Sequence, residues 1–410
     1  MWSRCCQCFI LLAFSSAISA ANPAINSLSL KSVLGEQPGP QGGAVFEKAV
    51  RPMEFHFPRD HLAHQAYKTE WWYFTGNVST GNVSTGNVST GNLSEQDSDQ
   101  ESDQDSDQAF AYQFTLFRFA LHPEKNLPGN ASAWRSSNIY MAHIALTDIK
   151  QGKFYQRERF SRDGLALAGA EKKDDGFVQF WLHDWQAKSL LPERLFPLTL
   201  NIQDPQFTLN LQLEASKPMV LNGDQGLSQK SAEHASYYYS YTRLLSRGSI
   251  QTGGKTFPVS GNSWFDREWS TSSLGEDQQG WDWFALHLDD GSDLMLYQMR
   301  KKNGSKDIYS SGTFVDSLGN SKKLPAGEFQ LQAIDFWQSP ASGIRYPVKW
   351  QLLVPDQNIK LTVAAQVKQQ EWSKADGFSF NYWEGAVKVS GIKDHQPISG
   401  SGYLEMTGYD

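Results

Sequence analysis

The sequence predicts an all-β protein built from two consecutive antiparallel β-barrels packed together. Three observations predict this fold. A chain of 410 residues is long enough for two or three domains. Trp, Tyr and Phe number 14, 15 and 24, and aromatic residues favour half-buried strands. Strand-like runs recur at short spacing between turn residues, whereas helix-type periodicity is scarce.

The composition excludes several classes of protein. Hydrophobic residues make up 40% of the chain and charged residues 20%, so most of the chain can bury a core. The net charge of -7 lacks the basic excess of a general nucleic-acid-binding protein, and no nucleic-acid partner is expected. The mean hydropathy of -0.50 and the lack of a long apolar run in the mature chain argue against an integral membrane segment.

Residues 1–20 have the composition of a secretory signal peptide. Arg4 supplies the positive charge, an apolar stretch follows, and Pro23 breaks any continuing helix, which disfavours the alternative of a buried N-terminal helix. All three cysteines lie in this segment, so the processed chain has no disulfide, thiolate metal site or cysteine nucleophile. We therefore expect a periplasmic or secreted protein with a lead segment at residues 21–50.

A polar segment at residues 77–108 interrupts the first predicted barrel and is expected to be a disordered loop. It repeats the unit GNVST and continues as QDSDQESDQDSDQ. Such units cannot bury a core, and the carboxylates of the second part account for most of the net charge. The acidic run lacks the Gly and Glu positions of a calcium-binding EF-hand loop, so no metal is assigned to it. Because closure entropy grows slowly with loop length, we expect the fold to tolerate the insertion.

The strands are expected in two series, of which the first forms a barrel over residues 51–245 and the second a barrel over residues 246–410. The first series is Glu70 to Thr75, Phe110 to Phe117, Ile139 to Thr147, Phe177 to Trp185, Leu195 to Ile202, Phe207 to Glu214 and Tyr237 to Leu245. The second series is Gly248 to Thr252, Phe257 to Phe265, Trp281 to Leu288, Leu294 to Arg300, Asp307 to Val315, Glu328 to Trp337, Lys349 to Val354, Ile359 to Gln366, Tyr382 to Ser390 and Ser399 to Thr407. The first two strands form a hairpin around the polar loop. An Asp-Gly turn predicts a second hairpin between residues 281–288 and 294–300.

One aromatic and acidic cluster is a candidate for chemistry. Strand alternation groups its side chains on three faces: Trp264, Asp266 and Glu268; Trp281, Trp283 and His287; and Met295, Tyr297 and Met299. If these faces point into a barrel lumen, they enclose two carboxylates and an imidazole in an aromatic pocket. Desolvation there raises the pKa of a carboxyl group, which can then act as a general acid. The alternative is structural: Asp266 and Glu268 form ion pairs with Arg267 at a strand end, and the tryptophans belong to a core.

A second cluster consists of His61 and His64 followed by the run Glu70-Trp71-Trp72-Tyr73. Two His and a Glu are possible zinc ligands by type, but the spacing fixes no complete ligand set. We therefore expect no metal, and we expect His61, His64, Glu70 and Arg267 to give polar support to a site. The chain also lacks Gly-x-Ser-x-Gly, His-Glu-x-x-His and Gly-x-Gly-x-x-Gly motifs, and no cofactor is expected.

These residues resemble the AttH and carotenoid 1,2-hydratase (hydroxyneurosporene synthase)-like family. The N-terminal resemblance lies in Asp60-His61, His64, Tyr67 and the run EWWYFTGN from Glu70. The C-terminal resemblance lies in WFDREWS from Trp264, GWDWFA from Gly280 and LMLYQ from Leu294. It extends from about Phe57 to the C-terminus, and it departs from the family at the repeat loop, where a short turn is expected.

The resemblance implies two lipocalin-like (calycin) barrels, often encoded beside an ABC transporter of the lipoprotein-release or attachment type. The carotenoid hydratases of the family add water across an isoprenoid double bond by acid protonation, without a cofactor. Other relatives are described as secreted hydrolases or as having a lipid-related role. The sequence is more similar to the AttH branch than to the hydratases.

Three functions follow as predictions. The first is a periplasmic or secreted lipocalin-like protein that binds a lipid or isoprenoid-like apolar molecule and works with ABC transporter components. Its ligand would contact Trp71, Trp72, Tyr73, Trp264, Trp281, Trp283 and Tyr297, although alternation prevents Trp71 and Trp72 from both facing inward. The second is a cofactor-independent hydratase, isomerase or hydrolase in which Asp266 donates a proton and Glu268 or His287 positions water. The third is a non-catalytic accessory protein of the transporter. A buried Asp266 with a raised pKa favours the enzyme.

Overall fold

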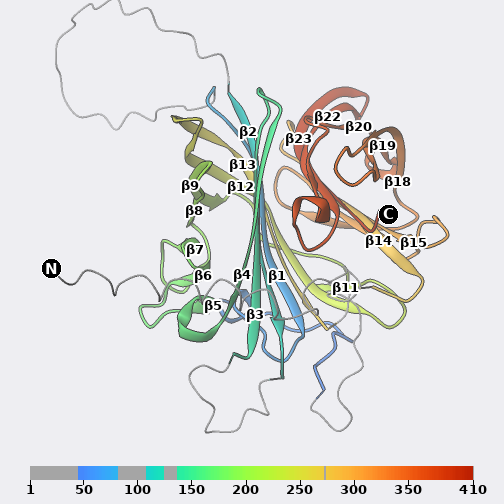
Figure 1. Ribbon diagram of the computed structural model, residues 1–410. Helices are drawn as coiled ribbons and strands as arrows, with labels where there is room; N and C mark the ends of the chain where they lie inside the picture. The colour runs from blue at the N-terminus through green and yellow to red at the C-terminus, as the bar shows by residue number, and fades with distance from the viewer. Residues whose placement is uncertain (1–44, 82–107, 124–135, 272–273, 410) are drawn as a thin grey trace, which may run out of the picture.

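The computed structural model describes residues 45–81, 108–123, 136–271 and 274–409 (Figure 1). The predicted signal peptide, most of the lead segment and most of the repeat loop lie outside these residues. Within the described ranges the regular structure is antiparallel β-sheet with short 3-10 turns, and no helix is long and apolar enough to cross a membrane. The all-β prediction is confirmed.

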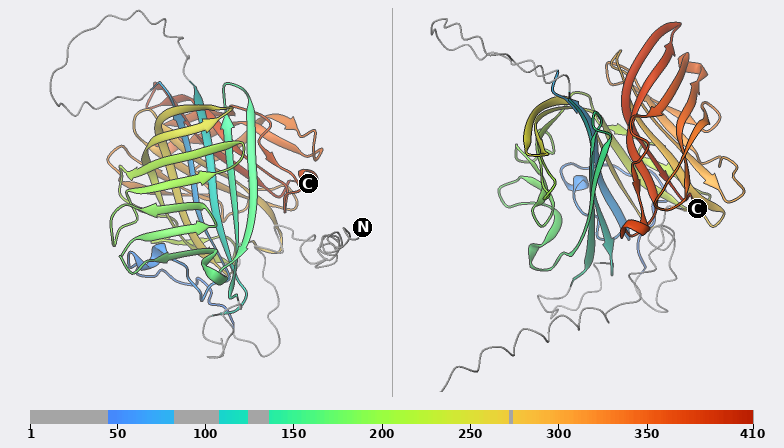
Figure 2. Two further views of the ribbon diagram at one scale, coloured as in Figure 1. Left: turned by 60° about the vertical axis from the view of Figure 1, so that its left-hand side comes forward. Right: turned by 45° about the horizontal axis from the view of Figure 1, so that its top comes forward.

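The first sheet has the strand order β4-β3-β2-β1-β13-β12-β9-β8-β7-β6-β5, with β10 and β11 paired to β12. Its strands are β1 (Thr69–Ser79), β2 (Ala109–Ala120), β3 (Asn138–Asp148), β4 (Lys153–Arg162), β5 (Ala168–Lys172), β6 (Val178–Leu182), β7 (Trp185–Ser189), β8 (Leu198–Gln203), β9 (Phe207–Ala215), β10 (Val220–Leu221), β11 (Leu227–Gln229), β12 (Ala235–Thr252) and β13 (Lys255–Ser270). The sheet curls over itself, so that β5 to β9, drawn in green, cross over β1 to β4 (Figure 2).

The second sheet has the order β17-β16-β15-β14-β23-β22-β20-β19-β18, with β21 paired to β22. Its strands are β14 (Gln278–Leu288), β15 (Asp293–Lys301), β16 (Ser311–Val315), β17 (Ser321–Pro325), β18 (Gln330–Gln338), β19 (Arg345–Val354), β20 (Ile359–Ala365), β21 (Glu371–Trp372), β22 (Tyr382–Lys393) and β23 (Gln396–Thr407). The described 3-10 turns are Arg59–His61, Gly164–Ala166, Pro355–Gln357 and Lys374–Asp376. Both predicted hairpins form, β1 with β2 and β14 with β15.

The boundary between the two sheets corrects the sequence prediction. Strands β12 and β13 both belong to the first sheet, so the division falls between Ser270 and Gln278 and not at residue 245. The sequence suggested a break because Gly248 interrupts the run of strand-forming residues. In the structure Gly248 continues β12 at a close crossing, where an added Cβ atom would lie 2.0 Å from the carbonyl oxygen of Asn210. One long strand had therefore been read as two.

Both faces of the central strands β1 and β13 are buried. Trp72, Phe265 and Trp269 point into the core of the first barrel. Tyr73 and Trp264, on the opposite face, pack in a separate cluster together with Trp283 and Met295 of the second sheet. The face that carries Asp266 therefore lies between the two barrels and not in a lumen, which corrects the predicted placement. Alternation shows which side chains share a face, but it does not tell which of two buried faces is the interior.

A buried ion network closes one end of the first barrel. The side chains of Glu70, Arg118 and Arg267 are fully buried, and both guanidinium groups form ion pairs with the Glu70 carboxylate. Burial raises the pKa of Glu70, but the two arginines outweigh burial and hold this pKa well below its usual range. Arg267 also stacks on Trp72 at 3.9 Å, and the ring of His64 stacks on Trp269 at 3.9 Å.

The network attaches the N-terminal segment to the sheet. Arg118 donates hydrogen bonds to the carbonyl oxygens of His64 and Tyr67, both at 2.8 Å. His61 contacts the hydroxyl of Tyr239 at 2.6 Å through Nδ1. The predicted polar residues His61, His64, Glu70 and Arg267 thus lie together, inside the first barrel.

We expect Glu70→Gln to lower the free energy of unfolding by about 3–5 kcal/mol, because it leaves two buried guanidinium groups without their counter-charge. Urea unfolding followed by tryptophan fluorescence measures the change. Glu54→Gln is the control, since the Glu54 side chain is 85% exposed. Equal stability of the two variants would contradict a central role for the network.

Candidate functional site

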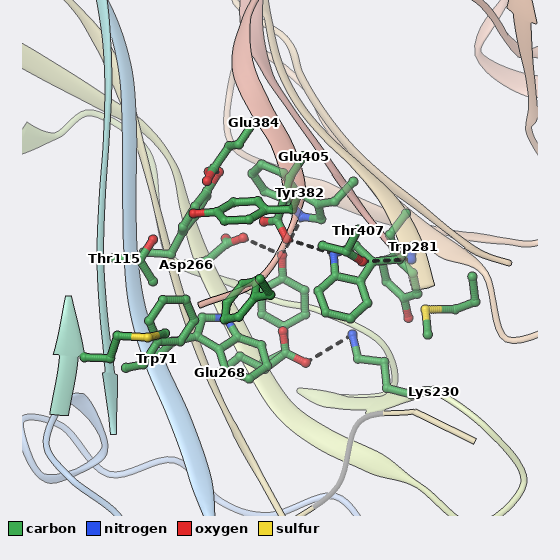
Figure 3. A pocket seen from close by; sticks show the side chains of 18 of the residues that line it. Trp71, Thr115, Lys230, Asp266, Glu268, Trp281, Tyr382, Glu384, Glu405 and Thr407 are labelled. Atoms are coloured by element: carbon green, nitrogen blue, oxygen red, sulfur yellow. Dashed lines mark hydrogen bonds and ion pairs between the residues drawn. The ribbon is translucent and has the colours of Figure 1, made fainter. Parts of the chain in front are cut away.

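A cavity of about 100 Å³ lies between the two sheets (Figure 3). Strands from both sheets supply its walls, so neither barrel forms it alone. Its lining is Trp71, Tyr73, Thr115, Phe117, Phe119, Met141, Lys230, Tyr238, Asp266, Glu268, Trp281, Trp283, Tyr297, Met299, Phe380, Tyr382, Glu384, Glu405 and Thr407. Most of these side chains are aromatic or apolar, and four carboxyl groups and one ammonium group lie among them.

Strand register explains why these side chains meet. Across β12, β13, β1 and β2, the pairing aligns Ser240, Asp266, Tyr73 and Thr115 in one row and Tyr238, Glu268, Trp71 and Phe117 in the next. Across β15, β14, β23 and β22, it aligns Tyr297, Trp283, Glu405 and Glu384 in one row and Met299, Trp281, Thr407 and Tyr382 in the next. The first sheet thus places Asp266 and Glu268 in neighbouring rows, and the second sheet places Glu384 and Glu405 in one row, against the same cavity.

The cavity becomes more exposed away from the carboxyl rows. Tyr73 and Thr115 are buried, whereas Trp71, Phe117 and Phe119, which follow in the neighbouring rows, are only half-buried. A ligand that enters along these rings meets the carboxyl groups at the inner end.

Asp266 is the most enclosed acid on the wall of the first sheet. Its Oδ1 accepts hydrogen bonds from Ser240 at 2.5 Å and from Nε1 of Trp264 at 2.6 Å, and its Oδ2 accepts one from Tyr238 at 2.6 Å. Burial raises the pKa of Asp266 to about 7, although these three hydrogen bonds act in the opposite direction. Asp266 makes no ion pair with Arg267, which points into the first barrel. A carboxyl group that titrates near neutrality can donate a proton and recover it.

Glu384 and Glu405 face Asp266 from the second sheet. They lie directly opposite each other on β22 and β23, and Tyr73 of the first sheet donates to Glu384 at 2.5 Å. Burial and the neighbouring Glu405 raise the pKa of Glu384 well above its usual range. Burial raises the pKa of Glu405 to about 7, against a hydrogen bond from Nε1 of Trp281 at 3.1 Å. Two such carboxyl groups cannot both ionise cheaply, so the pair holds at least one proton at neutral pH.

Glu268 and Lys230 form an ion pair at 3.1 Å beside these groups. The ammonium group of Lys230 also lies 4.2 Å from the ring centroid of Tyr297. Burial lowers the pKa of Lys230, but Glu268 outweighs burial, and the pKa lies above its ordinary value. Because the ammonium group is already paired, the cavity favours a neutral ligand over an anionic one.

The structure brings together only some of the residues predicted as a site. Asp266, Glu268, Trp71, Tyr73, Trp281, Trp283 and Tyr297 line the cavity. Trp72 points into the first barrel, and Trp264 lies behind Asp266. His61, His64, Glu70 and Arg267 belong to the ion network on the opposite face of the strands.

His287 does not line the cavity. Its Nε2 donates to the carbonyl oxygen of Thr242 at 2.7 Å, and its ring lies 5.8 Å from that of Trp264. Burial lowers the pKa of His287 to about 4, so the imidazole is neutral at neutral pH. His287 therefore does not lie in the cavity, where the sequence prediction placed it as a group that positions water.

Sequence reasoning missed Glu384, Glu405, Tyr382, Tyr238 and Lys230. A signal for the two glutamates was present, because each is a lone acid in an otherwise apolar strand, in YWEGAVKV and GYLEMTG. Apolar residues on both sides of each glutamate indicate a strand segment with both faces buried, in which the carboxyl group is buried as well. In the described part of the chain, no cluster of three or more His, Cys, Asp or Glu side chains could hold a metal ion.

Comparison with known proteins agrees with the motifs. A family model described as AttH-like matches residues 89–409. The chain belongs to the AttH-like family. A crystal structure described as an AttH from Nitrosomonas europaea is 30% identical, with a TM-score of 0.69, and the match covers 89% of this chain and 100% of that one. The comparison with curated proteins found no match.

Two more distant solved structures share the fold. Kievitone hydratase from Nectria haematococca is 14% identical with a TM-score of 0.61, and the match covers 86% of this chain and 93% of that one. CghA, solved with Sch210972, is 12% identical with a TM-score of 0.53, over 90% and 97% of the two chains. At these identities the likeness shows the fold alone. The resemblance inferred from the sequence motifs, and with it the lipocalin-like fold, is confirmed.

The raised pKa of Asp266 predicts how Asp266→Asn changes stability with pH. A carboxyl group whose pKa is raised by folding stabilises the protein below its ordinary pKa of 3.8, and that contribution is lost as pH rises to about 7. The amide of Asp266→Asn does not titrate, so the variant does not lose this stabilising contribution as pH rises. We therefore expect the stability of the variant relative to wild type to rise by about 4 kcal/mol between about pH 4 and about pH 8.

Urea unfolding at the two pH values measures this difference. Asp335→Asn is the matched control, since Asp335 is 51% exposed, and it should show no such rise. A relative stability of Asp266→Asn that does not change with pH would mean that Asp266 is ionised in the folded protein throughout.

Proposed function

We propose that this protein is a cofactor-independent hydratase that protonates a double bond in a neutral, apolar molecule and adds water to the resulting cation. The observation that carries the proposal is Asp266, a fully enclosed carboxyl group in an aromatic cavity, with a pKa raised to about 7. A site that only binds an apolar ligand has no need of three carboxyl groups with raised pKa values. Acid catalysis at neutral pH requires a carboxyl group that is still partly protonated at that pH, and a pKa near 7 meets this requirement.

The reaction has two steps in this proposal. The O–H bond of protonated Asp266 breaks and its proton forms a C–H bond with one alkene carbon, which leaves a cation on the other carbon. The oxygen of a water molecule then forms a C–O bond with the cation, and the water loses one proton to a carboxylate. The product is an alcohol, and the protein ends with the same number of protons as it had at the start.

The chain's own residues match each need of these steps. Tyr238, Ser240 and Trp264 hold the Asp266 carboxyl in place by hydrogen bonds. The rings of Trp71, Trp281 and Trp283 line the cavity, and aromatic faces attract a cation. Glu405, across the cavity, titrates near neutrality and accepts the proton released by water.

The relatives support the same class of reaction. One of the structures that share the fold is named as a hydratase. The carotenoid hydratases that the sequence resembles carry out this chemistry on isoprenoid chains, without a cofactor. An acyclic isoprenoid alkene is neutral and apolar, as the paired ammonium group and the aromatic lining favour.

Apolar-ligand carriage is the second candidate, and the aromatic cavity favours it equally. We rank carriage below hydration because binding an apolar ligand does not require the raised pKa values of Asp266, Glu384 and Glu405. Export through the signal peptide, periplasmic location and association with an ABC transporter remain predictions from the sequence. In the proposal they place the reaction outside the cytoplasm.

Hydration is tested with a panel of neutral acyclic isoprenoid alkenes, including neurosporene, in water enriched in oxygen-18. We expect wild type to form an alcohol that carries the heavy oxygen, detected by mass spectrometry. Asp266→Asn should lower the rate by about a hundredfold to ten-thousandfold, since it removes the proton donor. Asp335→Asn should match wild type. A bound alkene that is never converted would instead identify a carrier, and full activity of Asp266→Asn would exclude Asp266 as the donor.

The rate should also depend on pH in a defined direction. Because Asp266 acts in its protonated form and Glu405 in its ionised form, we expect a bell-shaped dependence of kcat/KM on pH, with a maximum near 7 and a tenfold fall per pH unit well above it as Asp266 loses its proton. A pH profile of the hydration rate measures this. A rate that rises through the same range would mean that Asp266 acts as a base.

A further inference from the structure

A chain of hydrogen bonds leads from the buried carboxyl pair to the edge of the first sheet. Tyr382 and Glu384 lie two residues apart on the same face of β22, and both side chains line the cavity. The Tyr382 hydroxyl lies 2.6 Å from Nδ1 of His143, and Nε2 of the same imidazole lies 2.8 Å from Oε2 of Glu158. Ser379 donates a further hydrogen bond to Oε1 of Glu158 at 3.0 Å. Hydrogen bonds thus connect Tyr382 of the second sheet to His143 and Glu158 of the first sheet, and Glu384 lies beside the Tyr382 end of this chain.

Strand register produces this chain. The row that contains Asp266 and Tyr73 continues through Thr115 of β2 to His143 of β3 and Glu158 of β4. In the described sheet β4 is an edge strand. The side chain of His143 is 1% exposed and that of Glu158 is 10% exposed, so the chain ends where water reaches it.

Aromatic rings around His143 shield the middle of the hydrogen-bond chain from solvent. Its ring stacks on Trp372 at a centroid distance of 4.4 Å and lies against Phe117 and Phe380 at 5.5 and 5.7 Å. Burial raises the pKa of Tyr382 well above its usual range, so the hydroxyl is not ionised. Tyr382 can therefore donate its proton to one neighbour only if it accepts a proton from the other neighbour at the same time. Protons therefore move along this path by hydrogen-bond exchange.

The chain has two proton arrangements that both satisfy every hydrogen bond. In one, Glu158 is protonated and donates to Nε2 of His143, Nδ1–H donates to Tyr382, and Tyr382 donates to ionised Glu384. In the other, Glu384 is protonated and donates to Tyr382, Tyr382 donates to Nδ1, and Nε2–H donates to ionised Glu158. A shift of three protons along the chain converts the first arrangement into the second. The net result is transfer of one proton from Glu158 to Glu384, with no change in total charge.

We propose that Glu158, His143 and Tyr382 form a proton relay that exchanges the proton of Glu384 with solvent. The inference rests on the proposed hydration, in which protons leave one cavity carboxyl and return to another. The relay lets the Glu384–Glu405 pair, of which Glu405 receives the proton released by water, exchange protons with solvent at the edge of the first sheet. Within it, His143 and Tyr382 are positioning residues that act on the substrate only through the carboxyl pair.

A purely structural role is the competing explanation, because the His143–Tyr382 bond also joins the two sheets. The two roles differ in what they control. A structural bond affects the stability of the protein and the position of the carboxyl vibration, whereas a relay controls the rate at which the buried proton exchanges.

Infrared spectroscopy after rapid mixing with heavy water measures that rate without any substrate. The C=O stretch of a protonated carboxyl shifts when its proton is replaced by deuterium, and the band missing in Glu384→Gln identifies Glu384. We expect this band to exchange more slowly in Tyr382→Phe and in Glu158→Gln, by about a hundredfold, the lower end of what a positioned proton-transfer group contributes. Tyr112→Phe is the matched control, because it removes a buried hydroxyl bonded to Ser263, outside both the cavity and the hydrogen-bond chain, and should leave the rate unchanged.

The outcomes separate the relay from the hydratase proposal. Slow exchange in both relay variants, with the control unchanged, supports the relay even if no alkene is hydrated. Exchange as fast as wild type in Tyr382→Phe overturns the relay and leaves hydration by Asp266 intact. Equal slowing in the control would also overturn it, since the effect would then not follow the hydrogen-bond chain. Glu158→Gln alters a partly exposed residue, so it provides a test even if a change at Tyr382 disturbs folding.

Discussion

The site depends on one constraint, the burial of both faces of β1 and β13. One face packs into the first barrel, and the other packs against the second sheet. Asp266, Glu384 and Glu405 are therefore largely removed from bulk water, and burial raises the pKa of each. On the opposite face Glu70 is equally buried, but ion pairs with two arginines keep it ionised and lower its pKa. Strands β1 and β13 thus carry the ionised Glu70 on one side and Asp266, whose pKa is raised, on the other.

Family and fold class could be predicted from sequence because they rest on local patterns. Alternation in WFDREW separated Asp266 and Glu268 from Arg267, as the structure has them. The cavity could not be predicted, because it forms where strands from distant parts of the chain meet. Asp266 and Glu384 face each other only because two sheets pack together, and nothing local to either residue specifies that contact. The sheet boundary was misplaced for a related reason: only the pairing with β9 and β13 reveals that Gly248 lies inside a strand.

The motif residues that look most like a site are largely structural. His61, His64, Glu70 and Arg267 hold the N-terminal segment to the barrel, and they carry much of the resemblance to the AttH-like family. Glu384 and Glu405 stand outside the motifs quoted for that resemblance, whereas Asp266 and Trp281 lie inside them. The quoted motifs therefore contain both the network that holds the N-terminal segment and part of the cavity wall.

The closure of the β1–β2 hairpin has a consequence for the tandem repeat. Strand pairing runs without a break to Ser79 and Ala109, and the next pair is fixed by a hydrogen bond from Thr80 to the carbonyl oxygen of Gln108. The side chain of Gln108 is itself anchored to Asp148 at 2.6 Å. The pairing that positions Tyr73 and Thr115 beside the cavity is therefore complete before the repeat begins, and it does not depend on the number of GNVST units.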